Sequence, residues 1–163
     1  VPLSTQDEIA APSGDTGIDP LPEFQAPVIS RFRSFAPPFA YLRHNNFQVR
    51  LDFNVTADSQ FVMRQGLADS SAVSIESVNF PGFYMRHQNN VIWLSPNDHT
   101  ENFAADATWW IRPGLAESTG LSFESFSQPN FYIGQRFGVT ALIEQTEAMT
   151  DRMRQDATFV EER

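Results

Sequence analysis

The sequence contains no cysteine and no lysine. Without cysteine, the chain can form no disulfide, no thiol nucleophile and no cysteine-bound metal site. Its 11 arginines stand against 20 acidic residues, and a net charge of −9 repels phosphate backbones. No apolar run approaches the roughly 18 to 20 residues that cross a bilayer, and no basic amphipathic helix offers a surface anchor. We therefore expect neither a nucleic acid nor a membrane as a partner.

Residues 1–28 are poor in apolar and basic side chains. They hold five of the 11 prolines and five acidic residues, but no arginine. Proline fixes φ and removes a backbone donor, and too few apolar residues are present here to offset the entropy lost on ordering. We predict an extended acidic arm or linker over 1–28, which would be ordered only by packing against its own domain or a protein partner. Residues 29–163 are enough for one domain.

From Ser30 onward the chain repeats itself three times. The segments SRFRSFAPPFAYLRH (30–44), VSIESVNFPGFYMRH (73–87) and LSFESFSQPNFYIGQ (121–135) align without gaps, and in each a serine, a proline and a tyrosine recur. The three frames then shift within one loop and coincide again at Asp58, Asp106 and Asp156. The repeats therefore span approximately 30–68, 73–116 and 121–163.

Each repeat has the pattern of about four short strands. In the middle repeat, alternating apolar residues at 73–75 precede a Pro81-Gly82 turn, and further β-type runs follow at 83–85, 91–94 and 108–111. Three such repeats predict an all-β fold, a β-trefoil whose closed barrel leaves no exposed strand edge; three blades are too few for a propeller. Residues 143–154 show no clean apolar stripe, so we expect a loop there with at most one helical turn.

The recurring aspartate has two interpretations. It could be structural, capping a turn through the backbone, just as the aromatic residue three positions later (Phe61, Trp109, Phe159) reads as a core position. However, a turn-capping aspartate is readily replaced by Asn or Ser, whereas here it is kept while its neighbours change. A histidine also ends the Tyr-x-Arg-His stretch in two repeats, at His44 and His87. The third histidine, His99, falls in a loop, where we expect it to be solvated.

The segments SIESVNFPGFYMRHQNNVIWLSPND (74–98) and FAADATWWIRPGL (103–115) resemble the arabinofuranose-binding module of α-L-arabinofuranosidases, the AbfB type. The resemblance extends over Ser30 to Arg163. It implies a β-trefoil in which each intact repeat forms a small pocket, where the Asp of Asp-Ala-Thr and the His of Arg-His hold a terminal arabinofuranose. On this basis His87 and Asp106 are the best pair. A carboxylate accepts hydrogen bonds from two adjacent hydroxyls, and an imidazole adds one donor and one acceptor.

The other two repeats depart from the family pattern. In the first, His44 and Asp58 are both present, but 14 positions separate them, against 19 between His87 and Asp106. In the third, Asp156 keeps its motif, but Gly134-Gln135 replaces Arg-His. Glu76 and Glu124, with Arg33 at the equivalent place, are interpreted as surface strand positions without a role.

Three function classes follow. The first is a non-catalytic, extracellular carbohydrate-binding module that recognises arabinofuranose side chains of arabinoxylan or arabinan. The second is a structural or assembly protein that uses the trefoil as a rigid block and the arm to bind neighbouring subunits. A glycosidase is disfavoured, because hydrolysis by the usual route needs two carboxylates roughly 5 to 10 Å apart, whereas the three aspartates belong to separate pockets. We expect no metal ion and no cofactor, since His44 and His87 lie in different repeats and the turn at Asn97-Asp98 lacks the spaced carboxylates of a calcium loop.

Overall fold

A computed structural model describes residues 26–163, so the predicted arm over 1–28 lies almost wholly outside the described residues. The described part of the chain forms one antiparallel sheet of 12 strands with two short α-helices and one 3₁₀ turn. The first repeat contains β1 (Arg31–Ser34), β2 (Tyr41–Asn45), β3 (Gln48–Asp52), η1 (Ala57–Ser59) and β4 (Phe61–Gln65). The second contains β5 (Val73–Ser77), β6 (Phe83–Gln88), β7 (Val91–Pro96), α1 (Glu101–Asp106) and β8 (Trp109–Pro113). The third contains β9 (Leu121–Ser125), β10 (Phe131–Arg136), β11 (Val139–Glu144), α2 (Asp151–Asp156) and β12 (Phe159–Glu162).

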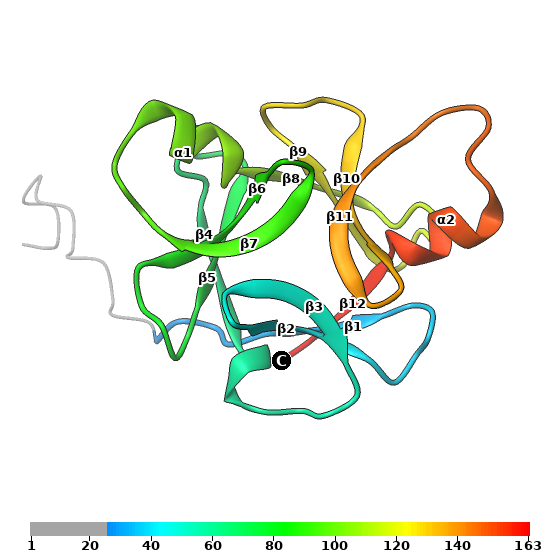
Figure 1. The fold of residues 1–163 in the computed structure, drawn as a ribbon, viewed down its shortest axis with the longest axis horizontal. Helices are drawn as coiled ribbons and strands as arrows, with labels where there is room; N and C mark the ends of the chain where they lie inside the picture. The colour runs from blue at the N-terminus through cyan, green and yellow to red at the C-terminus, as the bar shows by residue number, and fades with distance from the viewer. Residues whose placement is uncertain (1–25) are drawn as a thin grey trace, which may run out of the picture.

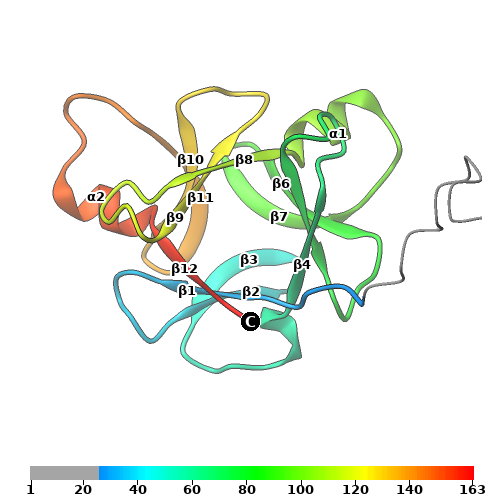
Figure 2. The same ribbon diagram turned by 180° about the vertical axis from the view of Figure 1, so that it is seen from behind.

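The pairing of these strands confirms the β-trefoil. The last strand of each repeat pairs with the first strand of the next, as β4–β5, β8–β9 and β12–β1, which closes a barrel. The hairpins β2–β3, β6–β7 and β10–β11 lie at one end, where β3, β7 and β11 pair with one another. Figure 1 looks onto the three lobes of this arrangement, and Figure 2 shows the barrel strands from behind. Because the barrel is closed, its strands pair with one another and leave no long free edge for another chain to join.

The predicted core aromatics occupy the centre of the barrel. Phe61, Trp109 and Phe159 are fully buried, one from each repeat. Phe32 and Phe123 pack beside them and contact each other edge to face, with their ring centroids 5.3 Å apart. Aromatic pairs in this geometry add to the stabilisation from buried apolar area. The threefold repeat of the sequence is thus a threefold repeat of core packing.

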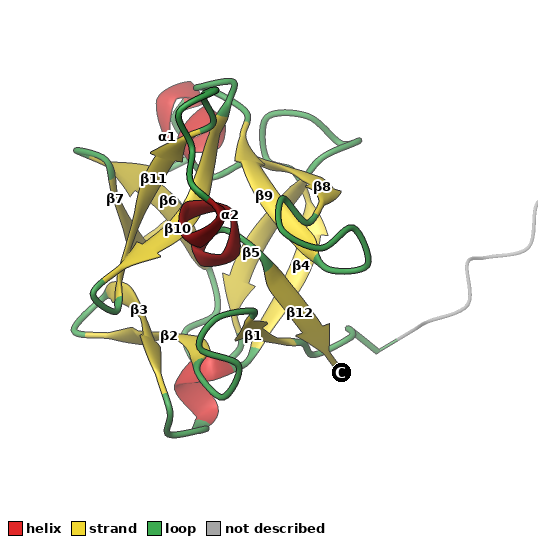
Figure 3. Ribbon diagram, turned by 90° about the vertical axis from the view of Figure 1, so that its right-hand side faces the viewer, coloured by secondary structure: helices red, strands yellow, loops and turns green. Residues whose placement is uncertain are grey.

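The prediction of a loop with one helical turn over 143–154 was correct for the loop over 145–150 and for the turn, which is the start of α2 at Asp151, but wrong at the other end, where strand β11 continues to Glu144. The equivalent helix α1 was not predicted. Helices of six residues are too short to show an amphipathic stripe, so their signal is the N-cap. Thr100 and Thr150 each accept a hydrogen bond from the backbone N–H three residues later, at 3.1 and 3.2 Å. In Figure 3, α1 lies at the top of the molecule and α2 faces the viewer in front of the strands.

Glu76 and Glu124 have structural roles, contrary to the interpretation from sequence. Each accepts a backbone N–H at 2.8 Å, from Gly82 and Asn130, respectively. The other carboxylate oxygen of each accepts from an arginine at 2.7 Å, Arg64 for Glu76 and Arg112 for Glu124. The first repeat carries the same cross-strand ion pair with its charges exchanged, Arg33 with Glu162 at 2.8 Å. The change of sign at this position is therefore compensated on the neighbouring strand.

Candidate functional site

The fold brings together the histidine and the aspartate of each of the first two repeats. His44 in β2 places Nε2 3.6 Å from Oδ1 of Asp58 in η1. His87 in β6 places Nε2 3.4 Å from Oδ1 of Asp106, the last residue of α1. The different sequence spacings are absorbed because the first repeat uses the three-residue η1 where the second uses the six-residue α1.

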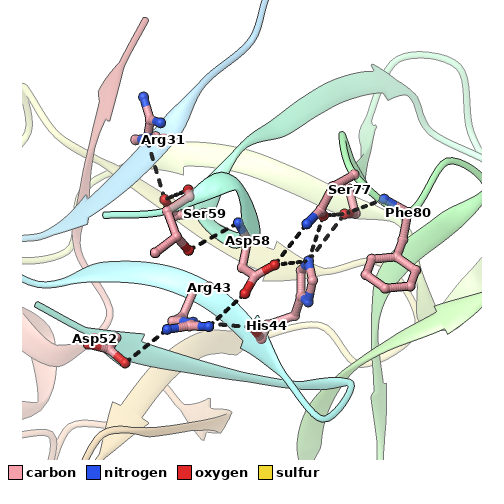
Figure 4. A network of polar contacts seen from close by, with 10 residues as sticks. Arg31, Arg43, His44, Asp52, Asp58, Ser59, Ser77 and Phe80 are labelled. Carbon is pink, nitrogen blue, oxygen red and sulfur yellow. Dashed lines mark hydrogen bonds and ion pairs between the residues drawn. The ribbon is translucent and has the colours of Figure 1, made fainter. Parts of the chain in front are cut away.

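The following repeat completes the first of these sites. Asn79 Oδ1 lies 2.8 Å from Nε2 of His44, and Asn79 Nδ2 donates to Asp58 Oδ1 at 2.8 Å. Ser77 Oγ lies 3.4 Å from the same ring nitrogen. Figure 4 shows this network, with Asp58 between Arg43 and the His44 ring. The site therefore belongs to the junction of two repeats.

The second site is built in the same way. Ser127 Oγ lies 2.8 Å from Nε2 of His87 and donates to Asp106 Oδ1 at 3.1 Å. Ser125 Oγ lies 3.2 Å from the ring nitrogen, as Ser77 does in the first site. Sequence reasoning missed Asn79 and Ser127. The available signal was the serine that recurs two positions earlier in each repeat, at Ser77 and Ser125.

An arginine holds the second carboxylate oxygen in both sites. Arg43 Nη2 donates to Asp58 Oδ2 at 2.6 Å, and Arg86 Nη2 donates to Asp106 Oδ2 at 3.2 Å. Each Nε donates to the backbone carbonyl of the adjacent histidine. A guanidinium with several donors fixes its partner's orientation as well as its charge. The motif arginine thus positions the carboxylate and the histidine backbone together.

Each carboxylate keeps an edge open to solvent. The side chains of Asp58 and Asp106 are 32% and 27% exposed, whereas those of His44 and His87 are 5% and 7% exposed. A cavity of about 280 Å³ opens beside the first pair. Phe47 and Phe80 line it, and their rings lie 5.5 Å apart in an edge-to-face arrangement. A small ligand entering there would meet a charged acceptor, an imidazole and two aromatic faces.

Burial favours the neutral form of the His87 ring. It lowers the pKa of His87, and the nearby Arg86 guanidinium lowers it further, while the Asp106 carboxylate opposes both effects. Desolvation disfavours the charged form of a buried base. A neutral imidazole presents one donor and one acceptor, which suits a hydroxyl partner.

The third repeat does not reproduce the site. Gln135 Nε2 donates to Asp156 Oδ1 at 2.7 Å, and Gln135 Oε1 accepts from the Gly138 N–H at 3.0 Å. Arg152 of α2 donates to the same Asp156 oxygen at 3.1 Å, and the Asp156 side chain is only 13% exposed. Ser34 Oγ, at the position of Ser77 and Ser125, is buried and has no hydrogen-bond partner among the described residues. Because residue 135 is not a histidine, the serine at the equivalent position has no ring nitrogen to contact.

Within residues 26–163, no cluster of three or more His, Asp or Glu side chains could hold a metal ion. No helix in this part of the chain is long and apolar enough to span a membrane.

Known proteins are similar to this chain in both sequence and fold. The alpha-L-arabinofuranosidase B (ABFB) domain profile matches residues 52–161. The alpha-L-arabinofuranosidase B of Emericella nidulans is 32% identical over 77 residues, covering 44% of this chain and 15% of that protein. The extracellular exo-alpha-(1->5)-L-arabinofuranosidase of Streptomyces avermitilis is 43% identical over 65 residues, covering 36% of this chain and 14% of that protein.

Solved structures extend the match to most of the described chain. An arabinofuranosidase complexed with arabinofuranosyl-alpha-1,2-xylobiose superposes with a TM-score of 0.76 and 27% identity, covering 86% of this chain and 32% of that one. The BEL β-trefoil, at 14% identity and a TM-score of 0.63, supports the fold alone. The chain thus spans a small part of the enzymes it matches. Because the domain profile matches more than half of its length, the chain belongs to the alpha-L-arabinofuranosidase B (ABFB) domain family.

Proposed function

We propose that this domain is a non-catalytic module that binds terminal arabinofuranose side chains of arabinoxylan or arabinan through its first two repeats. The observation that carries the proposal is the paired arrangement of a buried histidine and a partly exposed aspartate at two equivalent junctions, His44 with Asp58 and His87 with Asp106. Asp156 of the third repeat, which sequence analysis also nominated, is not part of this proposal because Gln135 stands in place of the histidine and the Asp156 side chain is only 13% exposed.

The chemistry of the two sites suits a sugar. Each charge-assisted hydrogen bond from a hydroxyl to Asp58 or Asp106 contributes about 1.5–3 kcal/mol net. Orientation of the carboxylate by arginine reduces the ordering cost of binding. One small neutral sugar should still bind weakly, with a Kd of roughly 0.1–1 mM. Two sites on one branched polymer would raise the apparent affinity through effective concentration.

The carboxyl groups support a binding role over hydrolysis. The usual glycosidase route needs a general acid whose pKa is raised, with a second carboxylate nearby. Asp58 and Asp106 belong to separate junctions, where each carboxylate contacts an arginine, a histidine and a polar side chain of the next repeat. The bond-cleaving chemistry of a longer parent enzyme would then reside in another domain.

The proposed location is extracellular, where such polysaccharides are found and where the Streptomyces avermitilis relative is named as acting. The alternative role in assembly depends on an arm that lies almost wholly outside the described residues, and it is not proposed.

Affinity electrophoresis in gels that contain arabinoxylan tests the function. We expect Asp58→Ala and Asp106→Ala each to reduce retardation of the protein by the polymer, and the double variant to migrate as it does in a polymer-free gel. Glu147→Ala is the matched control, since it removes the same charge from an exposed position outside both sites. Retardation of the double variant equal to that of Glu147→Ala would show that the sites do not bind the polymer.

A further inference from the structure

The third repeat has a hollow of different character. A cavity of about 760 Å³ lies beside Asp156, at the position equivalent to the two histidine sites. Its volume falls within the roughly 300–1,000 Å³ usual for small-molecule sites. Most of its wall is apolar and comes from two repeats, Leu51 and Phe53 from the first and Phe137, Ile143 and Met153 from the third. We call this cavity the third hollow.

Replacement of the motif arginine makes the third hollow apolar. In the second repeat, the Arg86 guanidinium lies over the Phe103 ring at 5.1 Å and reaches Asp106. In the third repeat, Gly134 stands in place of Arg86, and a Cβ at Gly134 would overlap the Ile143 side chain. Met153 stands in place of Phe103 and lines the cavity. The space that a charged group fills in one repeat is therefore bounded by hydrocarbon in the other.

Gln135 and Asp156 at the third hollow are engaged within the protein, whereas the exposed Arg136 side chain also lines the cavity. Both ends of the Gln135 amide are hydrogen-bonded, to Asp156 and to the Gly138 backbone. Arg152 also donates to Asp156 through Nε, but its side chain is 70% exposed at the mouth. A bare sugar would find few free acceptors inside, whereas an apolar group would be well matched to the wall.

Phe137 adds an exposed aromatic face to the mouth. It is fully exposed at the tip of the β10–β11 hairpin and has φ 54°, whereas the equivalent tips carry Asn46 and Asn89 at φ 51° and 53°. Asparagine tolerates this left-handed conformation, but a bulky aromatic residue rarely adopts it. A bulky aromatic residue in this unfavourable conformation, fully exposed beside an apolar cavity, points to a ligand. Phe53, which is 64% exposed, also lines this cavity.

We propose that the third hollow binds an aromatic ring carried on a sugar, as in an aryl ester or aryl glycoside. The ring would stack on Phe53 or Phe137 and cover Met153, while the Arg152 guanidinium meets the oxygen that joins ring and sugar. The domain would then bind unsubstituted arabinofuranose at two junctions and an aryl-substituted sugar at the third. This specificity rests on the proposed function for the first two sites, but the third hollow can be tested alone.

¹H–¹⁵N NMR titrations of the full chain separate the two proposals. The probes are methyl α-L-arabinofuranoside, 4-nitrophenyl α-L-arabinofuranoside and 4-nitrophenyl β-D-xylopyranoside. We expect both aryl glycosides to shift the amide signals of Phe137, Gly138 and Met153, and the methyl glycoside to shift only signals at the His44 and His87 sites. If the aryl glycosides do not shift the amide signals at the third hollow, the inference is overturned. If the methyl glycoside does not shift the signals at the His44 and His87 sites, the proposed function is overturned instead.

Two variants confirm the location. Phe137→Asn restores the residue type of the other two hairpin tips, and Met153→Phe fills the hollow with the residue found at position 103. Phe137→Asn should weaken binding of the aryl glycosides about three- to tenfold, the range expected for loss of one aromatic contact. Met153→Phe should weaken it because the larger side chain occupies the space of the ligand ring. Ile111→Asn, at an exposed position on β8, is the matched control. Aryl affinity equal in Phe137→Asn and Ile111→Asn would overturn the assignment of the ring to this hollow.

Discussion

At the residue scale, the site depends on a buried imidazole that stays neutral next to a carboxylate. The pKa of His87 is lowered chiefly by burial and secondarily by Arg86, against the attraction of Asp106. In the unfolded chain the histidine pKa returns to about 6.5. Above that pH both states are neutral at this group, so its contribution to stability is constant. As the pH falls below about 6.5, the unfolded state takes up the proton more readily and stability is lost.

His87→Gln tests this pH dependence. Gln is the natural residue at the equivalent Gln135, so the variant should fold. We expect the wild-type domain to lose more free energy of unfolding than His87→Gln between pH 7 and pH 5, because the variant has no proton to take up at this position. Urea denaturation at the two pH values measures the difference. An equal loss in both proteins would show that His87 does not titrate as proposed.

The sequence predicted half of each site. His44, Asp58, His87 and Asp106 recur in frame within their repeats, so alignment of the repeats was enough to nominate them. The partners Asn79 and Ser127 lie 35 and 40 positions from the histidines they contact. These contacts exist only because the barrel places the start of each repeat beside the middle of the previous one, which local patterns do not encode.

At the scale of secondary structure elements, one short helix positions one of the two carboxylates proposed to bind sugar. Helix α1 follows its N-cap residue, Thr100, and ends at Asp106. Unwinding of its first turn would therefore also displace the Asp106 carboxylate. The bounds of the two helices could not be predicted, because six residues are too few to show a helical periodicity of apolar side chains. Thr100 followed by Glu101 was the available signal, since both residue types are favoured at a helix N-terminus.

Removal of the cap should therefore affect both stability and binding. We expect Thr100→Ala to lower the free energy of unfolding by about 1 kcal/mol and to weaken arabinofuranose binding at the His87 site, while the His44 site is unaffected. Thr100→Ser, which keeps the hydroxyl, is the matched control. Thermal unfolding and site-resolved NMR titration measure the two effects. Unaltered stability in Thr100→Ala would mean that the hydrogen bond from Phe103 N–H does not hold the helix.

At the scale of the whole molecule, three sequence repeats predict three lobes, and the ends of the described chain must meet to close them. Strand β12 pairs with β1 along four residues. Glu162 accepts from Arg33 at 2.8 Å and from the Tyr41 hydroxyl at 2.6 Å. The equivalent junctions use the opposite charges, Glu76 with Arg64 and Glu124 with Arg112. Alignment of the repeats showed that Arg33 stands where the other repeats have glutamate. Only the pairing of β1 with β12 showed that Glu162 provides the opposite charge.

A charge exchange at this junction tests the closure. Arg33→Glu should destabilise the domain by about 1 kcal/mol or less, since the pair is partly exposed and screened. Arg33→Glu combined with Glu162→Arg should recover most of the loss, because it recreates the arrangement of the other two junctions. Urea denaturation of the two single variants and the double variant measures the coupling. Strictly additive losses would contradict a direct interaction across β1 and β12.

The central claim is that two equivalent junctions of the trefoil each hold a sugar. The most direct measurement is a crystal structure of the domain soaked in an arabinofuranosyl oligosaccharide. The account predicts density for arabinofuranose at both junctions, with ring hydroxyls within hydrogen-bond distance of Asp58 and His44 in one and of Asp106 and His87 in the other. Crystals whose soaked ligand is well ordered elsewhere, with both junctions empty, would contradict it.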